Sequence, residues 1–116
     1  MILRGEVYWL DPSGAVGAEI RKVRPWVIVS NDDFNEHLKT VVAAPISSGD
    51  VKSWLNEVEI PEGTFGDGRP CRIKTHQIRC VDKSRIGERL GKLPAGPMFA
   101  LDASLRVHLG LEPEGD

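Results

Sequence analysis

The pattern of apolar and polar positions along the chain predicts several short strands followed by one helix. The clearest strand is the apolar run Trp26 to Val29, which follows Arg24 and Pro25 and ends at Asn31. An apolar run of roughly four to eight residues between turn formers is typical of a strand buried on both faces. A proline at the first strand position costs no ladder hydrogen bond. We therefore expect Arg24 to lie at the mouth of a core strand, where the sheet fixes its direction.

Further strands are predicted on both sides of this run. Alternating or continuous apolar positions indicate them at Gly5 to Leu10, Thr40 to Ser47, Trp54 to Ile60, Cys71 to Asp82 (as one or two strands) and Arg85 to Leu93. Turn segments that contain glycine and proline separate these strands. The longest such segment extends from Asp11 to Lys22. Asn31 or Asp32 is expected to cap a short helical turn that reaches His37.

The end of the chain predicts an α-helix. Pro97 suits a first helical turn, Met98, Leu101 and Leu105 fall on one face, and Gly110 ends the pattern. Many short strands with a single terminal helix predict a mainly β, α+β fold, namely a small, partly open antiparallel barrel. We expect one domain over residues 1–111 and a short frayed tail over residues 112–116.

Length and composition agree with one globular domain. The chain has 116 residues, of which 41% are hydrophobic and 28% charged. It contains no apolar run near the roughly 18 residues that span a bilayer, and its start lacks a signal-like apolar core. We expect a cytoplasmic protein without membrane contact. Cys71 and Cys80 form no CxxC pair, so a reduced, buried pair is expected, with a disulfide or redox role as the alternative.

The charge is distributed unevenly along the chain. The whole chain carries −2, yet residues 69–92 hold eight cations and two anions, a net charge of +6, so that the remainder carries −8. With Arg21, Lys22 and Arg24, these cations predict a basic face that could bind a nucleic acid. The alternative is that alternating strands point the cations to several sides.

Several sequence blocks, in order, resemble the MazF/PemK family of toxin endoribonucleases. They are RGEVYWLDP, VRPWVIVSND, VVAAPISSG, HQIRCVDKSRIGERLGKLP and LDASLRVHLGL, and they extend from Arg4 to Leu111. The resemblance implies an SH3-like barrel of the kind shared with the gyrase poison CcdB, and a homodimer. It further implies metal-independent cleavage of single-stranded RNA, and inhibition by a cognate antitoxin whose acidic, disordered C-terminal segment would occupy the same groove.

The resemblance also implies an active site. Arg24 matches the principal catalytic arginine of the family's RP motif, and Ser47 stands where a catalytic or phosphate-contacting threonine is usual. His76 replaces an acid of the second active-site strand, and its ordinary pKa suits base chemistry near neutrality. Ala18 replaces a histidine of the PemK-like branch, so that histidine's role cannot be transferred to this chain.

Substrate contacts are expected around these residues. The loops Pro12 to Lys22 and Ser48 to Trp54 match those that shape the family's RNA groove, and Trp54 or Phe65 could stack a base if exposed. The expected substrate-binding residues are Glu19, Lys22, Ser48, Trp54, Lys74, Gln77 and Arg79. Ser48 could also replace Ser47, and Glu19 could instead be a solvated loop acid.

No group of His, Cys, Asp and Glu has metal-ligand spacing, so we expect no metal and no cofactor. His37 and His108 are expected to be structural. A different function on the same barrel also fits the sequence: a non-catalytic interaction module that binds nucleic acid or poisons a protein target, as CcdB does. Retention of Arg24 together with a hydroxyl at Ser47 favours the endoribonuclease.

Overall fold

The computed structural model describes residues 1–61, 64–65 and 69–111. The elements, in chain order, are β1 (Glu6–Leu10), β2 (Arg24–Ile28), α1 (Asp32–His37), β3 (Thr40–Ser48), η1 (Ser53–Leu55), β4 (Val58–Ile60), β5 (Cys71–Ile73), η2 (Thr75–Gln77), β6 (Arg79–Asp82), η3 (Lys83–Arg85), β7 (Ile86–Lys92) and α2 (Ala95–His108). Here η denotes a short 3-10 helix. The predicted tail at 112–116 lies outside the described residues.

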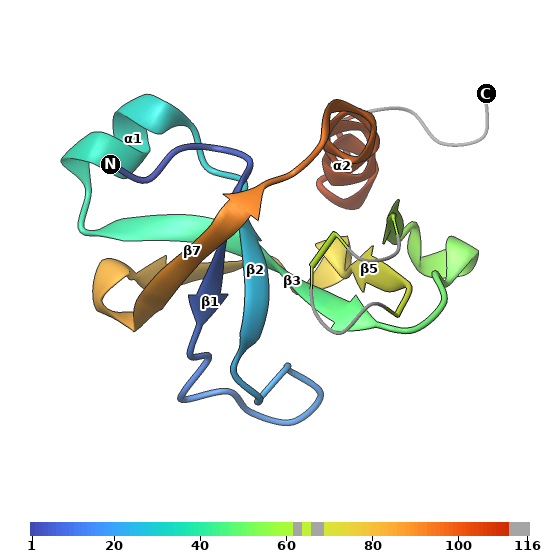
Figure 1. Ribbon diagram of the computed structural model, residues 1–116, viewed down its shortest axis with the longest axis horizontal. Helices are drawn as coiled ribbons and strands as arrows, with labels where there is room; N and C mark the ends of the chain where they lie inside the picture. The colour runs from blue at the N-terminus through green and yellow to red at the C-terminus, as the bar shows by residue number, and fades with distance from the viewer. Residues whose placement is uncertain (62–63, 66–68, 112–116) are drawn as a thin grey trace.

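The strands form one antiparallel, partly open sheet (Figure 1). Its order is β4-β5-β3-β2-β1-β7, and β6 also pairs with β3. One edge of β3 pairs with β2, while the other pairs with β6 near Thr40 and with β5 near Ser48. In the described part of the chain the sheet does not close, and α2 packs against β4. The predicted mainly antiparallel fold with a C-terminal helix is confirmed.

Strand β2 separates two apolar clusters and is buried on both faces, as predicted. Val27 packs in a cluster with Ile46 and Leu101, whereas Trp26 and Ile28 pack in a second cluster, and each of these β2 residues is at most 2% exposed. Side chains alternate along a strand, so Arg24 lies on the Trp26 face. The central strand thus positions a cation beside an indole.

The local elements follow the predicted signals at most positions. The side chain of Asn31 caps α1 by accepting a hydrogen bond from the Phe34 backbone N–H at 2.9 Å. Pro94 precedes α2, and Pro97 lies in the first turn of that helix, as predicted. The segment Cys71–Asp82 forms two strands separated by η2.

The predicted strand over Trp54 to Ile60 is wrong in its first half. Residues Ser53–Leu55 form η1, Asn56 adopts a left-handed φ of 54°, and β4 begins only at Val58. The side chain of Trp54, the first residue of the predicted strand, is 80% exposed. An Asn in the left-handed region ends the helical turn, since its short polar side chain tolerates this conformation.

The two cysteines differ in exposure to solvent. Neither Cys71 nor Cys80 forms a disulfide, and Cys71 is buried, but Cys80 is exposed, so the expected buried pair is wrong for that residue. Cys80 lies at an outward position of β6, where alternation turns it away from the core.

Neither described helix has the length and apolar character needed to cross a bilayer.

Candidate active site

Arg24 and Ser47 meet across neighbouring antiparallel strands. The β2–β3 pairing places Trp26 opposite Pro45, and continuing this register places Arg24 opposite Ser47. The Arg24 guanidinium Nη1 donates a hydrogen bond to Ser47 Oγ at 3.0 Å. The sheet therefore fixes the relative positions of a cation and a hydroxyl, the two groups that the sequence predicted to act together.

The Arg24 guanidinium lies in a half-buried position with unused hydrogen-bonding capacity. Burial lowers the pKa of Arg24 from its ordinary value, because desolvation disfavours the charged form. Its Nε atom is buried and makes no hydrogen bond to the described residues. Guanidinium groups bind phosphate through several N–H donors in a fixed geometry, and a desolvated one binds more strongly. Arg24 thus has the chemistry of a phosphate-binding group.

Two further cations lie on the Ser47 side of the sheet. Ser47 pairs with Arg72 across β3 and β5, and the Lys74 backbone N–H donates to the Pro45 carbonyl at 2.9 Å. Burial lowers the pKa of the Lys74 amine first, and the positive charge of Arg72 lowers it further. A phosphodiester bound here would meet positive charge from two strands.

A buried acid that the sequence did not point out lies among these cations. The side chain of Glu57 is fully buried. Its Oε1 accepts a hydrogen bond from the Lys52 backbone N–H at 2.8 Å and lies 3.6 Å from Arg72 Nε. A buried carboxylate beside clustered cations reduces their mutual repulsion. The sequence signal was weak, since an acid in an alternating strand usually faces solvent.

His76 lies on η2, next to Lys74 in the fold. Desolvation lowers the pKa of its imidazole, the charges of Lys74 and His108 lower it further, and Glu57 partly opposes this shift. Its ring lies 6.1 Å from the His108 ring, centroid to centroid. His108 itself is bound to the Leu55 carbonyl at 2.8 Å, as a structural histidine would be. His76 is therefore the histidine with a free, partly desolvated ring near the cations.

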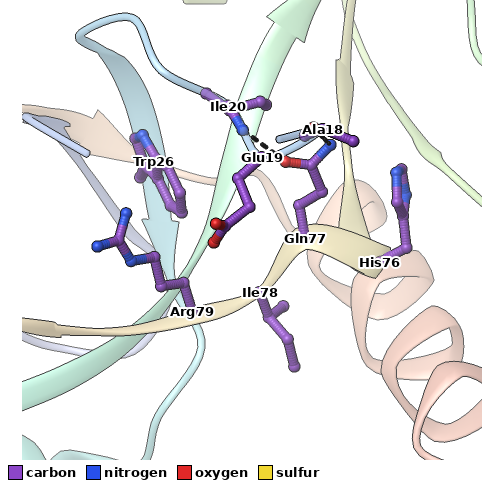
Figure 2. A pocket seen from close by; sticks show the side chains of 8 residues that line it. All are labelled: Ala18, Glu19, Ile20, Trp26, His76, Gln77, Ile78 and Arg79. Atoms are coloured by element: carbon purple, nitrogen blue, oxygen red, sulfur yellow. Dashed lines mark hydrogen bonds between the residues drawn. The ribbon is translucent and has the colours of Figure 1, made fainter. Parts of the chain in front are cut away.

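A cavity of about 360 Å³ lies beside His76 (Figure 2). The loop between β1 and β2 forms one wall through Ala18, Glu19 and Ile20, and the segment His76 to Arg79 forms the other, with Trp26 of β2 at one side. Gln77 joins the two walls, because its Oε1 accepts a hydrogen bond from the Ile20 backbone N–H at 2.9 Å. The cavity thus combines apolar surfaces with polar groups at its rim, as ligand sites commonly do.

The β1–β2 loop is anchored at its other end by arginines. Arg79 donates to the Pro12 and Ser13 carbonyls at 3.0 and 3.1 Å, and Arg85 donates to the Ser13 carbonyl at 2.7 Å. Glu19 accepts a hydrogen bond from the Val16 backbone N–H of the same loop at 2.7 Å. Arg79 and Gln77 were expected to contact substrate, but several of their hydrogen-bonding groups bind the backbone of the β1–β2 loop instead.

The remaining predicted residues lie on other surfaces and loops. Ser48 lies on the opposite face of β3 from Ser47 and lines a second cavity of about 510 Å³ with Arg24, Pro25 and Leu90. Trp54 is exposed on η1, whereas Phe65 is only 6% exposed, so of these two rings Trp54 meets the condition for stacking a base. Lys22 is exposed on the β1–β2 loop.

The predicted basic face is present in a reduced form. Arg24, Arg72 and Lys74 share one side of the sheet, but Arg89 is paired with Glu6 at 2.6 Å on the β1–β7 side. Strand alternation therefore sends part of the positive charge elsewhere, as the alternative interpretation held. Within the described residues, no three His, Cys, Asp or Glu side chains are grouped so as to hold a metal ion.

Comparisons with known proteins identify the family. Residues 3–109 match the family model of the PemK-like, MazF-like toxin of type II toxin–antitoxin systems. Endoribonuclease MazF of Staphylococcus epidermidis is 38% identical over 112 residues, which cover 96% of this chain and 93% of that protein.

Solved structures agree in fold. A mycobacterial endoribonuclease in complex with its cognate antitoxin has a TM-score of 0.79 at 26% identity, covering 97% of this chain and 99% of that one. MazF from Deinococcus radiodurans has a TM-score of 0.78 at 26% identity, covering 93% and 96% respectively. The resemblance seen in the sequence is confirmed, and the chain belongs to the PemK-like, MazF-like toxins of type II toxin–antitoxin systems.

Proposed function

We propose that this chain, a MazF-type toxin endoribonuclease, cleaves single-stranded RNA at selected sequences without a metal ion. The ribose 2′-oxygen attacks the adjacent phosphorus, the bond from phosphorus to the 5′-oxygen breaks, and the products are a 2′,3′-cyclic phosphate and a 5′-hydroxyl. The reaction needs a base at the 2′-oxygen, an acid at the leaving oxygen and donors around the phosphoryl oxygens.

The hydrogen bond between Arg24 and Ser47 is the observation that carries this proposal. It holds a partly desolvated guanidinium at the end of a rigid strand, where its N–H groups stabilise charge on the phosphoryl oxygens. Ser47 orients the guanidinium and donates a hydrogen bond from its hydroxyl to the same phosphate. Lys74, on the same side of the sheet, supplies a further positive charge.

His76 is our choice for the general base. Its lowered pKa keeps the imidazole neutral near pH 7, the form that accepts the proton of the 2′-hydroxyl. Protonated His76 would lie near Lys74, whose positive charge favours return of the proton to the leaving 5′-oxygen. One residue thereby serves both halves of the proton transfer.

The RNA follows the loops on either side of Arg24. Glu19, Lys22, Gln77 and Arg79 belong to the side of the β1–β2 loop, while Ser48 and Trp54 extend the path beyond β3. Trp54 is 80% exposed and is suited to stack a base, an interaction worth roughly 1–3 kcal/mol.

The proposed partners follow from the family and from the charge of the site. The mycobacterial relative was solved with its cognate antitoxin. We propose that the antitoxin of this chain inserts an acidic, disordered C-terminal segment over Arg24 and Lys74, because such a segment folds onto a basic groove. We further propose a homodimer in the cytoplasm, where cellular RNA is available as substrate.

The deciding experiment compares the wild type, Arg24→Ala and Arg24→Lys on a mixed-sequence RNA in excess chelator. The wild type should leave cyclic-phosphate and 5′-hydroxyl ends at one recurrent motif. Arg24→Ala should lower kcat by about 10²–10³-fold with an unchanged circular dichroism spectrum. Arg24→Lys should recover only part of the rate, since an ammonium cannot reproduce the planar donor geometry.

Two results would count against this mechanism. Normal cleavage of an RNA with a single 2′-deoxyribose at the cut site would exclude attack by the 2′-oxygen. Intact RNA alongside growth arrest would support the non-catalytic interaction module instead.

A further inference from the structure

Glu57 is a buried acid that the proposed cleavage reaction does not use. Its side chain has no exposure to solvent, and its Oε1 lies 3.6 Å from Arg72 Nε. Oε1 also accepts a hydrogen bond from the Lys52 backbone N–H, whereas Oε2 is buried and accepts none from the described residues. An unpaired buried acceptor costs free energy, and a buried ion pair is often no more stabilising than an apolar pair of similar volume. Stability of the fold is therefore a weak explanation for this carboxylate.

The strand register places Glu57 among the cations of the candidate active site. Val58 pairs with Ile73 between β4 and β5, and continuing this antiparallel register by one residue places Glu57 opposite Lys74. Both residues of the Val58–Ile73 pair are buried in the core. Side chains alternate along a strand, so Glu57 shares the other face with Lys74 and Arg72. A fixed negative charge thus lies beside two of the positive charges of the site.

Glu57 is also linked to His76 through the packing of α2. His108 Nε2 of this helix lies 2.8 Å from the carbonyl oxygen of Leu55, two residues before Glu57. The His108 ring in turn lies 6.1 Å from the His76 ring, centroid to centroid. His76 also follows Lys74, the residue opposite Glu57, by two positions. Glu57 and His76 are therefore connected both across the β4–β5 pair and through α2.

The charge of Glu57 opposes the other influences on His76. The charged or titratable side chains around the His76 ring are Glu57, Arg72, Lys74 and His108, with Glu19 and Arg79 at the adjoining cavity. Strand β3 also packs against η2 but carries no charged residue. Desolvation lowers the pKa of His76 first, the negative charge of Glu57 raises it, and the neighbouring positive charges lower it again. A general base is most effective when its pKa lies near the working pH, so Glu57 keeps His76 closer to that range.

We propose that Glu57 is a positioning residue of the endoribonuclease: it holds Arg72, and its buried negative charge sets the pH range in which His76 acts as the base. Glu57 touches neither the RNA nor the reacting atoms, because its side chain is closed to solvent. This assignment rests on the proposed function, in which His76 takes the proton of the 2′-hydroxyl.

The first measurement is an NMR titration of the His76 ring in the full chain, which requires no RNA. The signal of this ring is assigned by its loss in His76→Gln. Glu57→Gln keeps the shape of the side chain and an acceptor for the Lys52 N–H but removes the negative charge, so the titration midpoint of His76 should move to lower pH. Arg72→Gln breaks the same ion pair but removes a positive charge, so the midpoint should move to higher pH. A merely structural role would not give opposite shifts, because both variants lose the same contact.

The second measurement is the pH profile of kcat/KM on one short RNA. Its acid limb should move with the NMR midpoint, to lower pH in Glu57→Gln and to higher pH in Arg72→Gln. The double variant leaves neither charge of the pair unpaired, so it should stay folded in thermal melting, and its midpoint should lie between those of the single variants. Glu59→Gln is the matched control: it removes an exposed carboxylate two residues farther along the chain, where water screens the charge, and both midpoints should stay unchanged.

The outcomes distinguish this inference from the function on which it rests. Cleavage by the wild type, with the same His76 midpoint in Glu57→Gln or with both single variants shifted in one direction, would overturn the role of Glu57 alone. A shifted NMR midpoint without a shifted acid limb would show that His76 is not the base, and the role of Glu57 would fail with it. RNA left intact by the wild type at every pH would overturn the endoribonuclease proposal itself. Opposite shifts of both midpoints in the two variants support the proposal.

Discussion

At the scale of single residues, the site depends on which face of a strand each side chain occupies. Ser47 and Ser48 are neighbours in sequence, yet Ser47 accepts a hydrogen bond from Arg24 and Ser48 lines the cavity on the other face. Side chains alternate strictly along a strand, so adjacent hydroxyls cannot substitute for each other. The alternative of Ser48 acting in place of Ser47 therefore has little geometric support.

Paired serine variants test this difference. Ser47→Ala should lower kcat severalfold, because the guanidinium loses its fixed acceptor and the phosphate loses a donor, whereas Ser48→Ala should change mainly KM. Ser47→Thr keeps the hydroxyl and restricts its rotamer, so its rate should be at least that of the wild type. Steady-state kinetics on one short RNA would measure all three. A larger loss of kcat in Ser48→Ala would contradict the assignment.

The pKa of His76 predicts a pH dependence. Desolvation and nearby positive charge place this pKa below its ordinary value of 6.5. A neutral base is required, so kcat/KM should rise with pH along an acid limb whose midpoint lies below pH 6.5. His76→Gln should lower the plateau and abolish that limb.

The matched control is His37→Gln, since His37 lies on α1 and its Nδ1 contacts the Asp33 carbonyl of the same helix. This variant should keep the full pH profile. An acid limb centred above pH 7 in the wild type would assign the proton transfer to another group.

At the scale of elements, the sequence predicted the β2 strand, the capped turn at Asn31 and the terminal helix. Each of these has a local signal in a short window. The 3-10 helix η1, which follows Lys52, was not predictable from the sequence. It ends at Asn56 in a left-handed conformation, and the Ser104 Oγ of α2 donates a hydrogen bond to the Asn56 carbonyl at 2.6 Å. A contact between residues 48 positions apart cannot be detected from the hydrophobic pattern of a short sequence window.

The site was predictable to a similar extent. Arg24 and Ser47 stand at the ends of two strands with clear signals, so their proximity follows from pairing those strands. Glu57 was missed as a site residue, because only the fold brings its carboxylate to the buried cations.

The β1–β2 loop gives a prediction at this scale. Arg85→Gln removes the donor to the Ser13 carbonyl without touching the cavity lining. Amide hydrogens of Asp11 to Lys22 should then exchange faster, because opening of the loop costs less free energy. Lys92→Gln, with the same loss of charge on β7, is the control and should leave the exchange unchanged. Equal exchange in both variants would show that Arg85 does not hold the loop.

At the scale of the whole molecule, charge is concentrated locally on a chain that is acidic overall. The net charge is −2, yet Arg24, Arg72 and Lys74 share one side of the sheet around Ser47. Such an arrangement attracts a polyanion to one side and repels it elsewhere, which favours correctly oriented encounters.

Salt dependence measures how many of these cations contact phosphate. For an uncleavable, 2′-deoxy-substituted RNA, the logarithm of the binding constant should fall linearly with the logarithm of the salt concentration. The slope should be about −0.7 per phosphate contact. Lys74→Gln should reduce this slope by about 0.7. Lys39→Gln is the charge-matched control, since Lys39 precedes β3 at the end opposite Ser47. An equal slope for Lys74→Gln and the wild type would place Lys74 outside the RNA path.

The way in which Arg79 and Arg85 hold the β1–β2 loop has an evolutionary consequence. Arg79 donates to the backbone carbonyls of Pro12 and Ser13, and Arg85 donates to that of Ser13. Every amino acid possesses such a carbonyl. Substitutions within the loop would therefore keep its anchorage while changing the side chains presented to RNA. A toxin built in this way can acquire a new cleavage sequence through a few loop mutations, and its catalytic strands need not change.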